Sequence, residues 1–140
     1  MKVVLFNGSR REKGCTYTAL SLVAGELKAA GIETEIFFVG GRVLKGETDA
    51  VVHEAKEILK TADAVVYGSP VYYASPSGEM LMFLDRLYGI AEAELLFKPA
   101  LTLFCSNRRV FFSCNRLFFR FASFFCRLGH RCGFRFRRYG

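Results

Sequence analysis

The sequence predicts an α/β fold in which a parallel β-sheet carries helices on both faces. Strand-like and helix-like patterns alternate along the first 105 of the 140 residues, an order typical of βαβ units with right-handed crossovers. The strand-like runs are mostly apolar, as expected for strands that are buried on both faces. A glycine-containing loop joins the first strand to the first helix. In such sheets, ligands bind at the carboxyl ends of the strands.

Each element follows from a local pattern. The expected strands span residues 2–6, 32–39, 63–68 and 98–105, and the second of them is expected nearer an edge than the first. The expected helices span residues 16–30, 48–61 and 77–88. Gly31 suits the end of the first helix, and Thr48 or Asp49 can cap the second. The stretches 40–46 and 69–78 are expected to be loops. Helical spacing predicts that the last helix faces the core with the side chains of Met80, Leu81, Leu84 and Leu87.

The composition indicates one domain with an apolar core, because 51% of the residues are hydrophobic. With five Cys and no recognisable signal peptide, we expect a reducing, cytoplasmic setting. No uncharged apolar run reaches the roughly 18 residues of a membrane-spanning helix, so we expect no membrane span.

The net charge of +7 is unevenly distributed. Residues 1–100 carry 11 Lys and Arg against 13 Asp and Glu, whereas residues 101–140 carry nine Arg and no acidic residue. The same tail holds ten of the fifteen Phe and four of the five Cys. We therefore expect a domain over residues 1–105 and a separate Arg/Phe/Cys-rich tail over residues 106–140.

The loop Asn7–Thr16 (NGSRREKGCT) has the features of a phosphate site. It opens a helix N-terminus, where free amides and the helix dipole favour anions. Ser9 and Thr16 offer hydroxyls, and Arg11 offers a planar set of charged donors. An ordinary strand-to-helix turn with solvated charges is the alternative.

Three known phosphate loops do not match this stretch. The dinucleotide fingerprint needs three glycines, but only Gly8 and Gly14 are present. The spacing between them is one residue too long for a nucleotide triphosphate loop, and Cys15 stands where that loop has Lys. A cysteine phosphatase loop needs Arg six residues after its Cys, where this chain has Ser21. The pattern favours a phosphate monoester held without metal.

The loop 69–78 offers a different surface at the end of the third strand. Pro70 fixes the backbone, and Tyr72 and Tyr73 present flat apolar faces with polar tips. A phosphate cradle and an aromatic wall in one crevice describe a site for flavin mononucleotide (FMN). The alternative is that both tyrosines merely pack on the surface.

Residues 1–100 resemble the flavodoxin-like NAD(P)H-dependent FMN reductases, a group that includes iron–sulfur flavoproteins. The resemblance implies a flavodoxin-like sheet with FMN where the strand order switches; here we expect the order 2-1-3-4, with a fifth strand missing or replaced. The stretches that carry it are 7–9, 14–16, 68–75 and 82–86. The cofactor-binding residues that it implies are Ser9, Arg11, Cys15 and Thr16 at the phosphate and Pro70, Val71, Tyr72 and Tyr73 beside the isoalloxazine.

Some positions depart from the family pattern or have two explanations. Many relatives carry a cysteine cluster between the second strand and the second helix, but residues 40–49 contain no Cys. We therefore expect no iron–sulfur cluster and no metal. Asp85 and Arg86 resemble helix residues that fix the loop above them, although a surface ion pair is an equal explanation.

The tail has four possible explanations. From about Val110 to Gly129, polar residues three or four apart predict an amphipathic helix. Such a helix can lie on a membrane, and Arg with interleaved Phe can bind single-stranded nucleic acid. Cys126, His130 and Cys132 could ligate a metal, although their spacing matches no strong zinc pattern. We favour a tail that arose from a reading-frame error or a truncated gene, in which case strand 98–105 becomes an exposed edge.

These observations predict an FMN-binding oxidoreductase that passes electrons from NAD(P)H to a quinone, a flavin or another acceptor. The expected partners are a small-molecule electron acceptor and a second copy of the chain, with no nucleic acid. No catalytic side chain is assigned, because the chemistry belongs to the cofactor. An FMN-binding electron carrier and a truncated inactive fragment are the alternatives.

Overall fold

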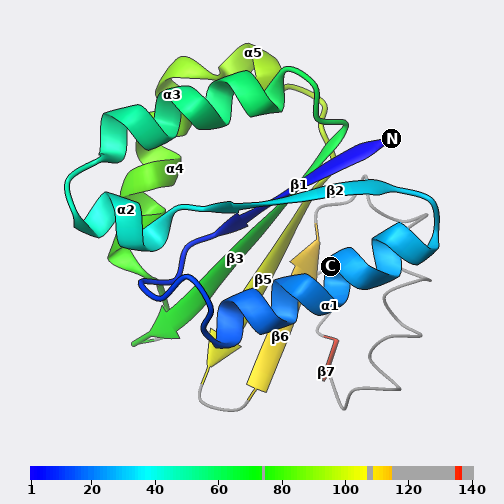
Figure 1. Cartoon of the computed structure of the whole chain (residues 1–140). Helices are drawn as coiled ribbons and strands as arrows, with labels where there is room; N and C mark the ends of the chain where they lie inside the picture. The colour runs from blue at the N-terminus through cyan, green and yellow to red at the C-terminus, as the bar shows by residue number, and fades with distance from the viewer. Residues whose placement is uncertain (74, 107–108, 115–134, 137–140) are drawn as a thin grey trace.

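In a computed structural model of the chain, a mainly parallel sheet forms the centre of the molecule (Figure 1). The structure describes residues 1–73, 75–106, 109–114 and 135–136. The strand order is β2-β1-β3-β5-β6-β7, so the predicted order of the first four strands is confirmed, with β2 at the edge. The strands are β1 (Lys2–Asn7), β2 (Glu33–Phe38), β3 (Ala64–Tyr72), β4 (Ser75–Pro76), β5 (Ala100–Ser106), β6 (Arg109–Cys114) and β7 (Arg135–Phe136).

Helices cover both faces of this sheet, as the sequence predicts. Helix α1 lies on one face, and α2 to α5 lie on the other (Figure 1). Gly31 follows α1 with φ +77°, the left-handed conformation expected after a helix end. The helices are α1 (Cys15–Ala29), α2 (Gly40–Leu44), α3 (Thr48–Leu59), α4 (Gly78–Ile90) and α5 (Glu92–Leu95).

The core on the α4 side is built around the ring of Phe6, which is fully buried. Phe6 stacks on Tyr67 of β3 with 5.6 Å between ring centroids, and it meets Phe83 of α4 at 5.3 Å. These contacts join β1, β3 and α4 in one apolar cluster. They therefore hold the carboxyl ends of β1 and β3 and the start of α4 in fixed positions relative to one another.

Three local predictions were wrong. Residues 40–46 are not simply a loop, because Gly40–Leu44 form helix α2. The predicted loop 69–78 is largely ordered by pairing: β3 extends to Tyr72, and its last residues pair with the two-residue strand β4 in an antiparallel hairpin. On α4, Leu81 is 46% exposed and Phe83 is buried in its place, since the buried residues follow the spacing 80, 83 and 87.

The beginning of the tail is a strand rather than the predicted helix. Arg109–Cys114 form β6, which pairs antiparallel with β5. Strand β5 is therefore not the exposed edge that was predicted, because backbone hydrogen bonding to β6 continues the sheet. The rest of the expected helix, and the possible ligands Cys126, His130 and Cys132, lie outside the described residues. None of the described helices is long and apolar enough to cross a membrane.

Candidate functional site

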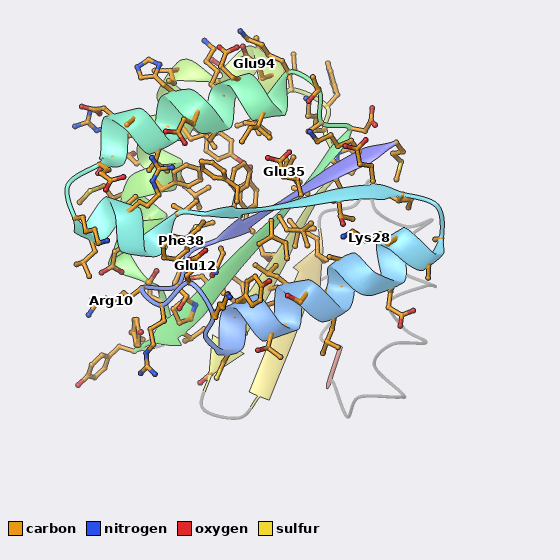
Figure 2. The ribbon with its side chains drawn as sticks, viewed as in Figure 1. Arg10, Glu12, Lys28, Glu35, Phe38 and Glu94 are labelled. Atoms are coloured by element: carbon orange, nitrogen blue, oxygen red, sulfur yellow. The ribbon has the colours of Figure 1, made fainter. Side chains whose placement is uncertain are left out.

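The loop after β1 is organised by the buried side chain of Asn7. The Asn7 Nδ2 atom donates to the carbonyl oxygen of Glu12 at 2.9 Å, and its Oδ1 atom accepts from the amide of Ser9 at 3.1 Å. This amide side chain therefore holds both ends of a tight turn. Figure 2 shows Arg10 and Glu12 on this loop, beside Phe38 at the end of β2. The turn lies at the carboxyl edge of the sheet, where ligands are expected.

The loop ends at the N-terminus of α1 with open backbone donors. Gly14 precedes the helix and has no side chain to cap it. The first amide of this helix with a backbone acceptor is that of Thr18, which donates to the Gly14 carbonyl. Among the described residues, nothing accepts from the amides of residues 15–17. These amides and the positive end of the helix dipole suit a bound anion.

Two predicted phosphate ligands, Ser9 and Arg11, lie on this loop in accessible positions. The Ser9 hydroxyl oxygen accepts from the amide of Arg11 at 3.3 Å. The Arg11 side chain is exposed and forms no ion pair within the described part of the chain. Arg11 therefore keeps its positive charge available beside the open amides of α1.

The other two predicted phosphate ligands lie in the first turn of α1, where Cys15 is exposed and Thr16 is buried. Cys105 of β5 is buried in the apolar cluster beneath α1. Burial raises the pKa of the Cys105 thiol to about 11, and the Thr16 side chain opposes part of that rise. The Cys105 thiol is therefore neutral at physiological pH.

The predicted ring-binding residues lie at the end of β3 and in its hairpin. Pro70, Val71 and Tyr72 are the last residues of β3, and Val71 and Tyr72 pair with β4. Tyr72 is half exposed, and Tyr73 is fully exposed with φ 49°. A left-handed conformation is uncommon for an aromatic residue, and it turns the chain sharply at this point.

The two segments meet through a chain of hydrogen bonds. The amide of Gly8 donates to the Gly68 carbonyl at 2.7 Å, and the Ser77 hydroxyl donates to the Gly8 carbonyl at 3.0 Å. The amide of Ser77 in turn donates to the Ser69 hydroxyl oxygen at 2.9 Å. The loop after β1 and the hairpin after β3 therefore lie side by side, as the sequence predicts.

Arg10 adds a second link between the two segments. Its Nε atom lies 2.7 Å from Oε1 of Glu79, in the first turn of α4. Its guanidinium carbon lies over the ring of Tyr72, 5.7 Å from the centroid. Sequence reasoning assigned no role to Arg10 or Glu79, because their separation of 69 residues gives no local signal.

Gly40 and Gly41 form a support for the loop that the sequence analysis did not identify. A Cβ atom on Gly40 would lie 2.3 Å from the Gly8 carbonyl oxygen, and one on Gly41 would lie 2.7 Å from that of Arg10. Only glycine lets α2 approach the loop backbone so closely. The adjacent glycines at the end of a strand were the available signal.

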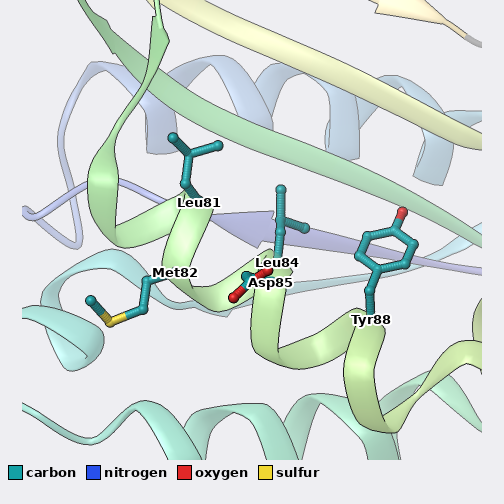
Figure 3. Close-up of a pocket in the computed structure, with 5 residues that line it drawn as sticks. All are labelled: Leu81, Met82, Leu84, Asp85 and Tyr88. Carbon is teal, nitrogen blue, oxygen red and sulfur yellow. The ribbon is translucent and has the colours of Figure 1, made fainter.

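A separate open groove of about 590 Å³ runs along α4 (Figure 3). Asp85 is one of its lining residues, and Arg86 forms a surface ion pair with Asp49 at 3.4 Å. The ion pair agrees with the second of the two explanations given for Arg86. The residues that line the groove are Leu81, Met82, Leu84, Asp85 and Tyr88.

Several curated proteins match the chain over about 100 residues, and two of them illustrate the range. One is an iron–sulfur flavoprotein of Methanocaldococcus jannaschii, 31% identical over 99 residues that cover 61% of this chain and 51% of that protein. The other is an NADPH azoreductase of Bacillus sp. strain OY1-2, 33% identical over 107 residues that cover 74% of this chain and 57% of that protein. The chain thus spans just over half the length of these two relatives.

Solved structures share the fold. An NADH:FMN oxidoreductase matches with a TM-score of 0.61 at 22% identity, over 96% of this chain and 71% of that one. The flavoenzyme FerB of Paracoccus denitrificans matches with a TM-score of 0.59 at 18% identity, over 74% of this chain and 59% of that one. The sequence profile of NADPH-dependent FMN reductases matches residues 1–116, which include β6. The chain therefore belongs to the NADPH-dependent FMN reductase family.

Proposed function

We propose that the chain binds FMN between the loop after β1 and the hairpin after β3, and that it is an NAD(P)H-dependent oxidoreductase. The observation that carries this proposal is the hydrogen bond between Ser77 and the Gly8 carbonyl, which brings an anion-binding loop next to an aromatic hairpin. A ligand with a phosphate at one end and a flat ring at the other matches this pair of surfaces.

The residues of the first loop fit the phosphate. The open amides of Cys15 and Thr16 would donate to its oxygens, with the Ser9 hydroxyl nearby and Arg11 supplying positive charge. The close approach of Gly40 leaves the loop backbone no space to collapse toward α2. The same donors would give riboflavin, which lacks the phosphate, much less binding energy.

The hairpin residues fit a flat ring. Pro70 and Val71 have no polar side-chain atoms, and Tyr72 and Tyr73 are exposed aromatic residues beside them. These residues would hold the isoalloxazine ring and restrict access of water to one of its sides. Bound FMN supplies the redox chemistry, since it can accept a hydride from a nicotinamide and pass electrons to an acceptor.

We propose a small-molecule acceptor, such as a quinone or a free flavin, and either NADPH or NADH as the donor. The family name supports NADPH, and the relatives include a protein named as an NADPH azoreductase. Because residues 40–49 contain no Cys, we propose a flavin centre without an iron–sulfur cluster.

The test is NAD(P)H oxidation by the purified chain loaded with FMN, with and without menadione. We expect oxidation of the nicotinamide that depends on both the protein and the acceptor, above the rate with free FMN alone. FMN binding without turnover would indicate an electron carrier that needs a separate reductase. A preparation that stays colourless after FMN is added and the excess removed would contradict the proposal.

A further inference from the structure

We propose that Arg10 and Glu79 form a clamp that fixes Tyr72 as the ring-facing wall of the flavin site. The inference rests on the proposed function and adds positioning roles for two residues outside the predicted ligand set. Arg10 comes from the loop after β1, Glu79 from the first turn of α4 and Tyr72 from the end of β3. The clamp therefore joins the three segments that border the proposed site.

The anchor of the clamp is the buried carboxylate of Glu79. Its side chain is 9% exposed, whereas that of Arg10 is 55% exposed. Oε1 accepts from Arg10 Nε, and Oε2 is buried with no partner among the described residues. A buried carboxylate is costly unless a cation compensates it. Glu79 therefore holds Arg10 in one orientation, and that orientation directs the guanidinium over Tyr72.

Contact with the guanidinium restricts Tyr72. The ring is half exposed at the end of β3, next to the left-handed Tyr73. A cation 5.7 Å from the ring centroid is attracted to the ring face. Because Nε is engaged by Glu79, the guanidinium plane cannot turn freely, and the ring keeps one preferred position.

The clamp also separates the roles of two neighbouring arginines. The charge of Arg10 is compensated by Glu79, whereas Arg11 has no ion pair in the described part of the chain. Arg11 is thus the residue available to the phosphate, and Arg10 acts on the ring side through Tyr72. Substitutions of Arg10 and of Arg11 should therefore differ in how they change the affinity for flavins with and without a phosphate.

The first experiment compares the affinities of FMN and riboflavin by fluorescence titration. R10A should weaken both ligands by the same factor, about 3- to 10-fold, whereas R11A should weaken FMN far more than riboflavin. R10A should have the same effect in a Y72F background, because the phenyl ring remains. In a Y72A background, R10A should have no effect on flavin binding. An R10A loss confined to FMN, or an undiminished R10A effect in the Y72A background, would overturn the proposal.

The second experiment needs no flavin. Urea unfolding of the apoprotein in a double-mutant cycle of R10A and Y72A should show a coupling of about 2- to 5-fold in the unfolding equilibrium constant. E79Q should reduce that coupling. If R10A and Y72A show no coupling in the chain that retains Glu79, the clamp is overturned. If R10A does not fold, R10M/E79Q removes the pair without an uncompensated buried carboxylate, and the same flavin results are expected of it. Failure of the wild-type chain to bind either flavin would contradict the proposed function, whereas this cycle still decides whether the clamp exists.

Discussion

The hydroxyl of Ser77 donates to the carbonyl of Gly8 across 69 residues of sequence, with 3.0 Å between the two oxygens. The same oxygen accepts from the amide of Met80 at 3.3 Å, so Ser77 also caps α4. One buried side chain therefore sets the start of a helix and holds the loop proposed to bind phosphate. The position of that loop depends on the start of α4 as well as on β1.

Ser77→Ala should lower the free energy of unfolding by about 1–3 kcal/mol, because it removes a helix cap and leaves the Gly8 carbonyl unpaired. Urea unfolding measures this loss. Ser21→Ala is the matched control, since the Ser21 hydroxyl is buried without a partner among the described residues; its effect should stay within about 0.5 kcal/mol. Equal losses in the two variants would argue against a special role for Ser77.

Gly40→Ala should displace the loop after β1, because the added Cβ would lie 2.3 Å from the Gly8 carbonyl oxygen. We expect a loss of about 1–3 kcal/mol in unfolding free energy and weaker FMN binding. Gly25→Ala, at an open position within α1, should instead stabilise the chain by about 0.5–1 kcal/mol. Unchanged stability and FMN affinity in Gly40→Ala would show that α2 does not support the loop.

Arg11→Ala should weaken FMN by roughly 1–3 kcal/mol, the range for losing a charge-assisted hydrogen bond. Isothermal titration with FMN and with riboflavin measures the difference. Lys13→Ala is the control, because it removes an exposed positive charge from the same loop. Losses that are equal for both flavins would place the phosphate elsewhere.

Cys105 predicts a pH dependence of stability at alkaline pH. Burial raises its pKa to about 11 in the folded chain, whereas a thiol in an unfolded chain titrates near pH 8.5. As the pH rises past 8.5, the unfolded chain loses the proton first, so stability falls with pH until the folded-state pKa is passed. The stability difference between wild type and Cys105→Ala should therefore shrink from pH 7.5 to 10.5 in urea unfolding. A constant difference would contradict the raised pKa.

The alternation of buried strands and amphipathic helices predicted the parallel sheet and the meeting of the two segments. The strand order came instead from the resemblance to the flavodoxin-like FMN reductases. Repeated βαβ units fix the direction of the strands, so the turns after β1 and β3 must lie at the same edge. The apolar runs around Phe6 and Tyr67 were enough for this inference.

The partners in the supporting contacts were not predictable, because each contact joins residues that lie far apart in the sequence. Local sequence patterns do not indicate that Arg10 pairs with Glu79 or that Gly40 packs on Gly8. The strand β6 was missed for another reason. Its run of Phe, Ser and Cys fits an amphipathic helix by spacing alone, and only pairing with β5 selects a strand.

The central claim is that the loop after β1 and the hairpin after β3 form one flavin site. It is tested most directly by two-dimensional NMR of the isotopically labelled chain during titration with FMN. We expect amide shifts in both segments at the same FMN concentration, in residues 9–16 and 69–73, with the shifts in residues 9–16 reduced when riboflavin replaces FMN. Shifts in only one segment, or shifts centred on the groove along α4, would contradict the claim.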